Sequence, residues 1–399
     1  MTGTGTGRTA KGAPSLESLL ATKEIVVFCG SGGVGKTSVA AAAGLAAAAR
    51  LGGKVLVVTV DPAKRLADAL GVESIGNVER RVPDDAFARA GLEARGELYA
   101  AMLDTKQSWD ALVMRHAPDE ATAYRILDNR LYDNLTARFV QSHDYVAMER
   151  LFEIHQAGTY DLIIVDTPPT RNALDFLDAP ARMAEFFGGR LLRWLTAPYR
   201  VGGRRGARFI TAASRPFYQV ADRLLGSQFL QDIAEFFLNF QSMYDGFVDR
   251  SRAVERLLHD KRTTFAVVTT LEDAPLREGE RFCQELITRD FHLGALVLNK
   301  TLPTALFGRD GARAAKQMRT EAATIATALD PQHASDVERV LVTVGTSFEN
   351  YAVVARREAE LRNELTHRPE VVVDVPTFSD EISDFSGLAR IASYLMPPS

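Results

Sequence analysis

The sequence has few cysteines and no long apolar run, and these absences exclude several classes of protein. Cys29 and Cys283 are the only cysteines in 399 residues, and they stand far apart in the chain. A disulfide framework and a CxxC metal site within one chain are therefore excluded, and the cysteine content fits a reducing cytoplasm. No hydrophobic run reaches the length of a transmembrane helix, which leaves only peripheral contact with a membrane open.

Neither sign of charge is in large excess. The formal net charge is -4 and the sequence pI is near 6.0, so we expect no nucleic-acid partner from overall charge. A hydrophobic fraction of 46% with 25% charged residues is ordinary for globular proteins. The Gly/Thr-rich start lacks an apolar core, so we expect residues 1–22 to form a disordered tail and not a signal peptide.

The strongest pattern is a glycine-rich loop between an apolar strand at 25–28 and an alanine-rich helix at 39–50. Gly30, four further residues and then Gly35-Lys36-Thr37 match the loop that binds nucleoside triphosphates, in which backbone N–H groups turn inward to the phosphates. Lys36 would reach the terminal phosphates, and Thr37 would offer its hydroxyl to Mg²⁺. We therefore predict that the nucleotide is held by Gly30, Ser31, Gly32, Gly33, Val34, Gly35, Lys36, Thr37 and Ser38.

The same glycines allow two alternatives. The run from Gly30 to Gly35 also spells the G-x-G-x-x-G of dinucleotide-binding loops, with Asp61 after the next strand. A dinucleotide site needs close backbone approach but neither a lysine nor a magnesium-binding hydroxyl, so Lys36 and Thr37 favour a triphosphate. The other alternative is a glycine-rich turn with a chance lysine, and the order of strand, loop and helix argues against it.

Apolar runs typical of strands alternate with helical patterns along the rest of the chain. We expect further strands at 54–60, 97–103, 161–166, 263–270, 293–299 and 371–375. Helices are expected at 63–70, 106–157, 275–289 and 348–365, with breaks near Pro118 and Ser142. This alternation predicts an α/β fold with a doubly wound, mostly parallel sheet, and ligands at the carboxyl ends of its strands. Those ends carry Gly30, Asp61, Asp166, Asn299 and Pro376.

Asp166 ends the apolar strand at 161–166, directly before a Thr-Pro-Pro-Thr turn. A carboxylate at the end of a buried strand, beside a phosphate-binding loop, can hold the water shell of Mg²⁺. Many strands end in aspartate before a turn for structural reasons alone. The prediction that Asp166 serves the metal therefore depends on its pairing with the loop.

Three motifs together resemble those of the deviant-Walker ATPases of the arsenical-pump (ArsA) and tail-anchored-protein-targeting (GET) family, particularly actinobacterial anion-transporting-ATPase members. The motifs are the loop at 31–37, Asp61-Pro62-Ala63, and Asp166-Thr167-Pro168-Pro169-Thr170 with Asn172-Ala173-Leu174. The likeness runs from about 23 to 395. It implies a P-loop NTPase domain over 23–399 that carries a helical insertion at about 180–260.

The resemblance also implies a role for individual residues in an ATPase that uses ATP and Mg²⁺. Asp61 would orient or deprotonate the attacking water and, with Thr37 and Asp166, serve the metal. The alternative for Asp61 is a strand-ending carboxylate that only caps the following turn. Asn299 matches the asparagine that reads adenine, because its amide can both donate and accept. Pro376 and Phe378 match a later loop that packs beside the base.

Two departures from the family pattern bear on partners. The loop usually begins with a lysine that reaches the phosphates of a partner subunit, and Ser31 stands at that position without a charge. Either this chain hydrolyses ATP slowly, or it pairs with a different subunit, so a homodimer and a heterodimer with a related ATPase both stay open. The second departure is the lack of a cysteine cluster or CxxC clasp, which argues against arsenite as a ligand.

The insertion at 182–258 has a row of apolar and aromatic residues at helical spacing: Phe229, Leu230, Ile233, Phe236, Phe237, Phe240, Met243, Tyr244, Phe247 and Val248. A second apolar set lies at 183–195. Between Arg190 and Arg215 the chain has five further arginines and no acidic residue, namely Arg193, Arg200, Arg204, Arg205 and Arg208. One interpretation is two helices packed on the body. The other is a groove for a hydrophobic helix or lipid-like client, with the arginines facing anionic groups.

We therefore expect a cytoplasmic Mg-dependent ATPase that couples ATP binding and hydrolysis to conformational change and to binding of a hydrophobic or anionic client or partner. The alternative is a nucleotide-stabilised binding or regulatory subunit of a heterodimer with little turnover, which Ser31 keeps open. A partitioning or cell-division-type ATPase of the same deviant-Walker class is a third interpretation. Asp61-Pro62-Ala63 and the aromatic insertion argue against it.

Overall fold

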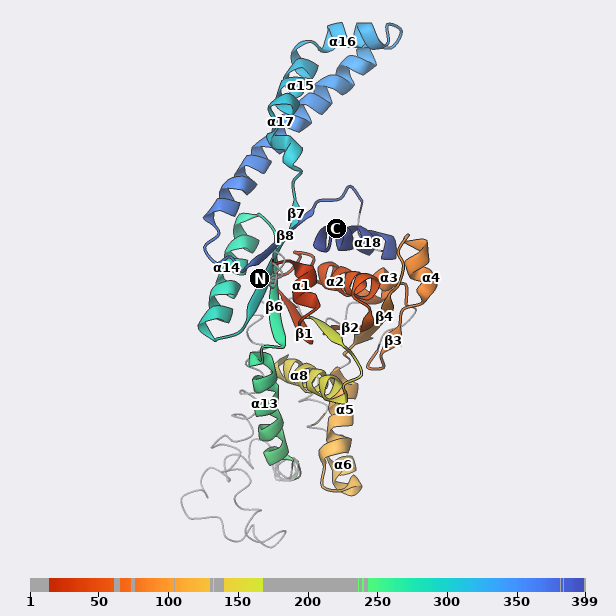
Figure 1. The fold of residues 1–399 in the computed structure, drawn as a ribbon, viewed down its shortest axis with the longest axis vertical. Coiled ribbons are helices and arrows are strands. Elements are labelled where there is room, and N and C mark those ends of the chain that lie inside the picture. Colours follow the sequence, from red (N-terminus) through yellow and green to blue (C-terminus); the bar gives the residue numbers. More distant parts are fainter. Residues whose placement is uncertain are drawn as a thin grey trace, which may run out of the picture.

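The centre of the structure, a computed structural model, is an eight-stranded sheet with the order β3-β4-β2-β5-β1-β6-β7-β8 (Figure 1). The structure describes residues 14–60, 65–72, 76–103, 105–129, 132, 140–167, 236, 239, 243–380, 382 and 384–397. The strands are β1 (Ile25–Cys29), β2 (Gly53–Thr59), β3 (Arg80–Arg81), β4 (Gly96–Met102), β5 (Leu162–Asp166), β6 (Thr263–Thr269), β7 (Leu293–Thr301) and β8 (Val371–Pro376).

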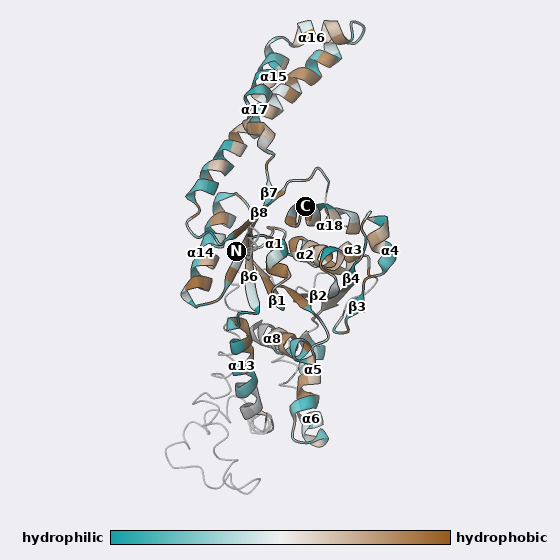
Figure 2. Cartoon of the chain, in the orientation of Figure 1, coloured by the Kyte–Doolittle hydropathy of each residue, from teal (hydrophilic) through white to brown (hydrophobic). Residues whose placement is uncertain are grey.

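All neighbouring strands in this sheet are parallel except β3 and β4, which pair antiparallel at one edge. Every residue of β1, β5 and β6 is buried. Continuous apolar runs are expected for parallel strands, because helices cover both of their faces. The predicted α/β class with a mostly parallel sheet is confirmed, and Figure 2 shows apolar residues in β1 and β2 at the centre of the sheet.

One face of the sheet is covered by α2 (Lys36–Arg50), α3 (Arg65–Leu70), α4 (Asp84–Arg89) and α18 (Phe385–Leu395). The alanines of α2 let it lie close to the sheet, and a Cβ at Gly44 would come within 2.3 Å of the Val57 side chain. The other face is covered by α8 (Val140–Ala157), α13 (Tyr244–His259) and α14 (Asp273–Thr288). Two apolar layers therefore enclose the strands.

The helix α1 (Leu16–Leu20) lies within the segment that we expected to be a tail. Ser15 caps it by accepting from the backbone N–H of Ser18, and the Ser18 side chain completes the capping box. Leu16 and Leu20 are 1% and 2% exposed and pack in the core beside α2. The predicted boundary at residue 22 is therefore too late, because these leucines belong to the folded domain.

Several other boundaries differ from the expected ones. The break near Pro118 is present, between α5 (Thr105–His116) and α6 (Glu120–Leu127). The helix α8 begins at Val140, close to the break expected around Ser142, and residues 133–139 before it lie outside the described part of the chain. Residues 334–347 are helical as well, because α17 spans Ala334–Glu364. It packs against α15 (Arg309–Thr320) and α16 (Ala322–Leu329), which the sequence pattern did not predict. These three helices form an arm that projects from the ends of β7 and β8 (Figure 1).

Much of the predicted insertion lies outside the described residues, including both aromatic segments apart from Phe236, Met243 and α13. Phe236 and Met243 are 1% and 2% exposed, and α13 buries Val254, Leu257 and Leu258 on the sheet.

None of the helices in the described ranges is long and apolar enough to cross a membrane.

Candidate active site

The glycine-rich loop lies between β1 and α2, and its glycines adopt conformations that other residues avoid. Gly30, Gly33 and Gly35 have φ angles of 149°, 80° and 86°. A Cβ at Gly30 would lie 2.1 Å from the backbone oxygen of Val268, and one at Gly35 would lie 2.4 Å from Asn299 Nδ2. Glycine is therefore required at Gly30, where a side chain would meet backbone atoms of β6, and is favoured at Gly35 by its positive φ.

Lys36 is the first residue of α2, and its side chain turns back under the loop. The ammonium is nearly buried, with the residue 6% exposed, and Nζ donates to the backbone oxygen of Ser31 over 2.8 Å. The Ser31 side chain is also buried, at 4% exposed, and its hydroxyl has no hydrogen-bond partner among the described residues. The loop thus has one internal cation at the start of a helix, where anions bind favourably.

The Asp166 carboxylate lies beside this helix start. Oδ2 accepts from the hydroxyl of Thr37 over 2.7 Å and from that of Thr59 over 2.9 Å, and the residue is fully buried at 0% exposed. The sheet brings these groups together, because β5 lies between β1 and β2 and pairs Asp166 with both Phe28 and Thr59. Hydroxyl and carboxylate oxygens are hard donors that suit Mg²⁺ and its water shell.

A cavity of about 610 Å³ opens beside the loop, within the range of roughly 300–1,000 Å³ that small-molecule sites occupy. Its walls come from the loop, α2, α3, the residue after β5, the end of β7 and the segment from β8 to α18. They are Gly33, Gly35, Lys36, Thr37, Ser38, Ala41, Leu66, Asp68, Ala69, Thr167, Asn299, Lys300, Pro376, Thr377, Phe378, Asp380, Ile382 and Ile391.

The structure therefore brings most of the predicted site residues to one cavity. Phe378 is held there by α18, with the Arg390 guanidinium 4.6 Å from its ring centre and Tyr394 at its edge. Asp61, predicted to act on water, lies outside the described residues. The cavity size, the glycine cradle and the carboxylate with its two hydroxyls fit ATP and Mg²⁺ as a ligand pair.

Sequence reasoning missed three polar residues of this region. Thr59 donates to the carboxylate, Lys300 donates from Nζ to the backbone oxygen of Gly33 over 3.2 Å, and Thr377 donates to the backbone oxygen of Lys300 over 2.8 Å. Thr59 and Lys300 stand at the carboxyl ends of predicted strands. Their position could have identified them as site residues, because the carboxyl ends of parallel strands lie together at one edge of the sheet, where ligands bind.

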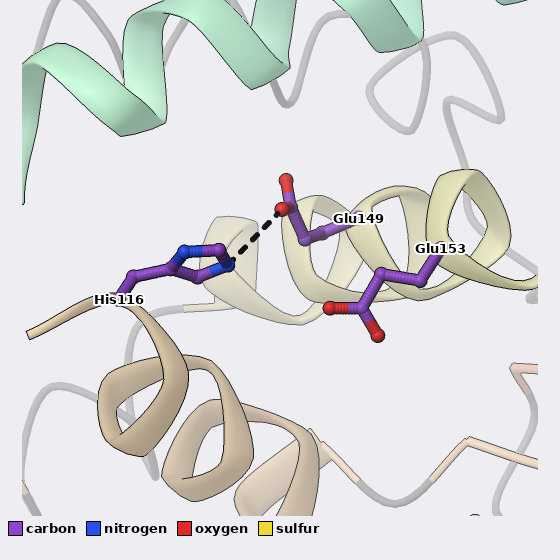
Figure 3. A group of neighbouring side chains, drawn as sticks. All are labelled: His116, Glu149 and Glu153. Atoms are coloured by element: carbon purple, nitrogen blue, oxygen red, sulfur yellow. Dashed lines mark ion pairs between the residues drawn. The ribbon is translucent and has the colours of Figure 1, made fainter. Parts of the chain in front are cut away.

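A second group of potential metal ligands lies away from the cavity, on α5 and α8 (Figure 3). One ligand atom from each of His116, Glu149 and Glu153 falls within 4.8 Å of the others. Both carboxylates already have cationic partners, since Glu149 pairs with Arg250 Nε at 2.5 Å and Glu153 pairs with Arg115 and Arg150.

Burial, together with Arg250 and Arg115, lowers the pKa of His116 to about 4, so the ring is neutral near pH 7. A metal ion would have to displace the arginines from the carboxylates. We interpret the group as an ion-pair network that joins α5, α8 and α13.

The family model of anion-transporting ATPases matches residues 23–324. The chain is 23% identical over 290 residues to "Putative arsenical pump-driving ATPase 1" of Aquifex aeolicus, a match that covers 70% of this chain and 63% of the relative.

Two further relatives show the same range of similarity. "Putative arsenical pump-driving ATPase" of Chlorobaculum tepidum is 23% identical, over 70% of this chain and 61% of its own. "ATPase get3" of Aspergillus terreus is 26% identical, with 75% and 78% covered. The chain thus spans less than two thirds of the two arsenical-pump relatives.

Proposed function

The chain belongs to the anion-transporting ATPase family, and from this premise we propose that it is a Mg-dependent ATPase. In this proposal, ATP binding and hydrolysis drive a conformational change and the binding of a hydrophobic or anionic client or partner. The observation that carries the proposal is the contact of the Thr37 and Thr59 hydroxyls with the buried Asp166 carboxylate, beside a loop that contains a buried lysine. Phosphoryl transfer in such ATPases requires both a loop that binds the phosphates and a carboxylate that holds Mg²⁺.

The residues of the site would have separate roles in the transfer of the γ-phosphoryl group of ATP to water. The backbone N–H groups of the loop bind phosphate oxygens, and Lys36 offsets the negative charge that spreads over the phosphoryl oxygens. Thr37 and Asp166 would hold Mg²⁺ and its waters, and the ion supplies further charge compensation when bound. Asp61, by family resemblance, orients the attacking water. Asn299, Pro376 and Phe378 bound the region proposed for adenine.

The proposal includes a dimer, of two copies or with a related ATPase, and a client surface within 182–258. Ser31 supports the heterodimer, because a serine cannot supply the positive charge that the family's loop lysine brings to the phosphates of a partner. The same residue favours a second candidate function, a nucleotide-stabilised subunit with little turnover of its own.

Steady-state ATP hydrolysis by the purified chain with Mg²⁺ tests the proposal. We expect measurable turnover that falls by roughly 100-fold or more in Asp61→Asn, since loss of a water-orienting base typically costs that much. Asp336→Asn, an exposed carboxylate on the arm, is the matched control and should hydrolyse ATP at the wild-type rate. ATP binding without turnover would instead support the regulatory subunit.

A further inference from the structure

Two consecutive residues at the end of β7, Asn299 and Lys300, reach back to consecutive carbonyl groups of the phosphate-binding loop. Asn299 Nδ2 donates to the backbone oxygen of Val34 over 2.7 Å, and Lys300 Nζ donates to that of Gly33 over 3.2 Å. Neighbouring side chains in a regular strand point to opposite faces of the sheet. A local distortion must therefore turn both of them toward the loop.

That distortion is a bulge in the pairing of β7 with β8. Asn299 pairs with Val375 and Thr301 pairs with Pro376, so Lys300 is the extra residue. Its φ angle is 58°, in the left-handed region that non-glycine residues seldom adopt.

Thr377 holds the bulge in place. Its hydroxyl donates to the Lys300 oxygen over 2.8 Å, and its N–H donates to the Thr301 oxygen over 2.9 Å. The bulge, held by Thr377, thus turns the Lys300 side chain toward the loop.

The two contacts determine where the loop's N–H groups point. In a trans peptide unit, the C=O of one residue and the N–H of the next point in opposite directions. Holding the Gly33 and Val34 carbonyls toward β7 therefore turns the N–H groups of Val34 and Gly35 to the opposite side. The absent Cβ at Gly35, which would lie 2.4 Å from Asn299 Nδ2, permits this close approach.

We infer that Asn299 and Lys300 form a clamp that orders the phosphate-binding loop before its ligand arrives, with Lys300 as a positioning residue for phosphate. The inference rests on the proposed function in that the ligand is the phosphate chain of a nucleotide. In this inference Asn299 also positions the loop, apart from any contact with a base, because its amide nitrogen donates to the backbone oxygen of Val34. Lys300 adds positive charge at a loop where Ser31 has none.

Calorimetric titration with inorganic tripolyphosphate and Mg²⁺ tests the clamp, because this probe contains no base or ribose. Lys300→Met keeps the apolar stem but removes the ammonium, and it should weaken tripolyphosphate binding by about tenfold, the effect of one lost charge-assisted hydrogen bond. Lys300→Arg, which keeps a cationic donor, should recover most of the affinity. Lys316→Met, an exposed lysine of the arm, is the control and should bind as the wild type does.

Lys300→Gly separates positioning from general stability. Glycine accepts the left-handed conformation without strain, so this variant should unfold at about the wild-type urea concentration while binding tripolyphosphate as weakly as Lys300→Met. Equal tripolyphosphate affinity in wild type, Lys300→Met and Lys300→Gly overturns the clamp, even if the chain hydrolyses ATP. Weakened tripolyphosphate binding in a chain without ATPase activity supports the clamp and contradicts the proposed hydrolase.

Discussion

Replacing Thr59 with valine tests the contacts that hold the buried Asp166 carboxylate. The Thr59 hydroxyl donates to Asp166 Oδ2 over 2.9 Å, and both residues are buried, with exposures of 1% and 0%. Valine has nearly the shape of threonine but cannot donate. Because hydrogen bonds to charged groups contribute about 1.5–3 kcal/mol, Thr59→Val should lower the free energy of unfolding by about 2 kcal/mol.

A matched control is Thr263→Val. The Thr263 hydroxyl is also fully buried, but it donates over 2.7 Å to a neutral acceptor, the backbone oxygen of Leu257, so its loss should cost only about 1 kcal/mol. Urea unfolding followed by circular dichroism compares the two variants. Thr59→Val alone should also raise the Mg²⁺ concentration needed for half-maximal ATP hydrolysis. Equal unfolding costs and an unchanged Mg²⁺ requirement would refute the reasoning.

Three further predictions concern the loop, a histidine and the thiols. Gly30→Ala places a Cβ 2.1 Å from a backbone oxygen and should be far more destabilising in urea unfolding than Gly71→Ala, whose Cβ meets nothing within 4 Å. Burial lowers the pKa of His116 from 6.5 to about 4, so the unfolded chain binds more protons in that window and stability should fall as pH drops through it. His116→Gln should flatten this slope in urea midpoints measured from pH 7 to 5. Burial raises the pKa of Cys29 and of Cys283, the latter to about 12, so iodoacetamide should alkylate neither thiol in the native protein at pH 8, as mass spectrometry can show.

The sheet and the phosphate-binding loop could be predicted because their signals are local. A glycine-rich loop between an apolar strand and a helix has its own spacing, and the strand ends at Asp166 and Asn299 are visible in the sequence. The contacts between those ends depend on the order of strands. Nothing local shows that β5 lies between β1 and β2, which is what brings Thr59 and Thr37 to the same carboxylate oxygen.

The features that sequence reasoning missed depend on packing. Lys300 reads as an ordinary polar residue after a strand, and only the bulge against β8 turns it to the loop. The helices α15 and α16 pack mainly on α17 and not on the sheet. Each therefore buries only a narrow apolar stripe, which gives a weak helical pattern in the sequence. The helix α1 is short, and its burial of Leu16 and Leu20 depends on the surface that α2 and the sheet present.

The central claim is that the cavity beside Lys36 and Asp166 binds ATP with Mg²⁺. Isothermal titration of wild type and Lys36→Met with ATP and Mg²⁺ tests this most directly. We predict saturable binding to the wild type and affinity reduced by roughly ten- to a hundredfold in Lys36→Met, because the variant removes the buried ammonium of the loop. Equal affinity in the two proteins, or no binding to the wild type, would contradict the account.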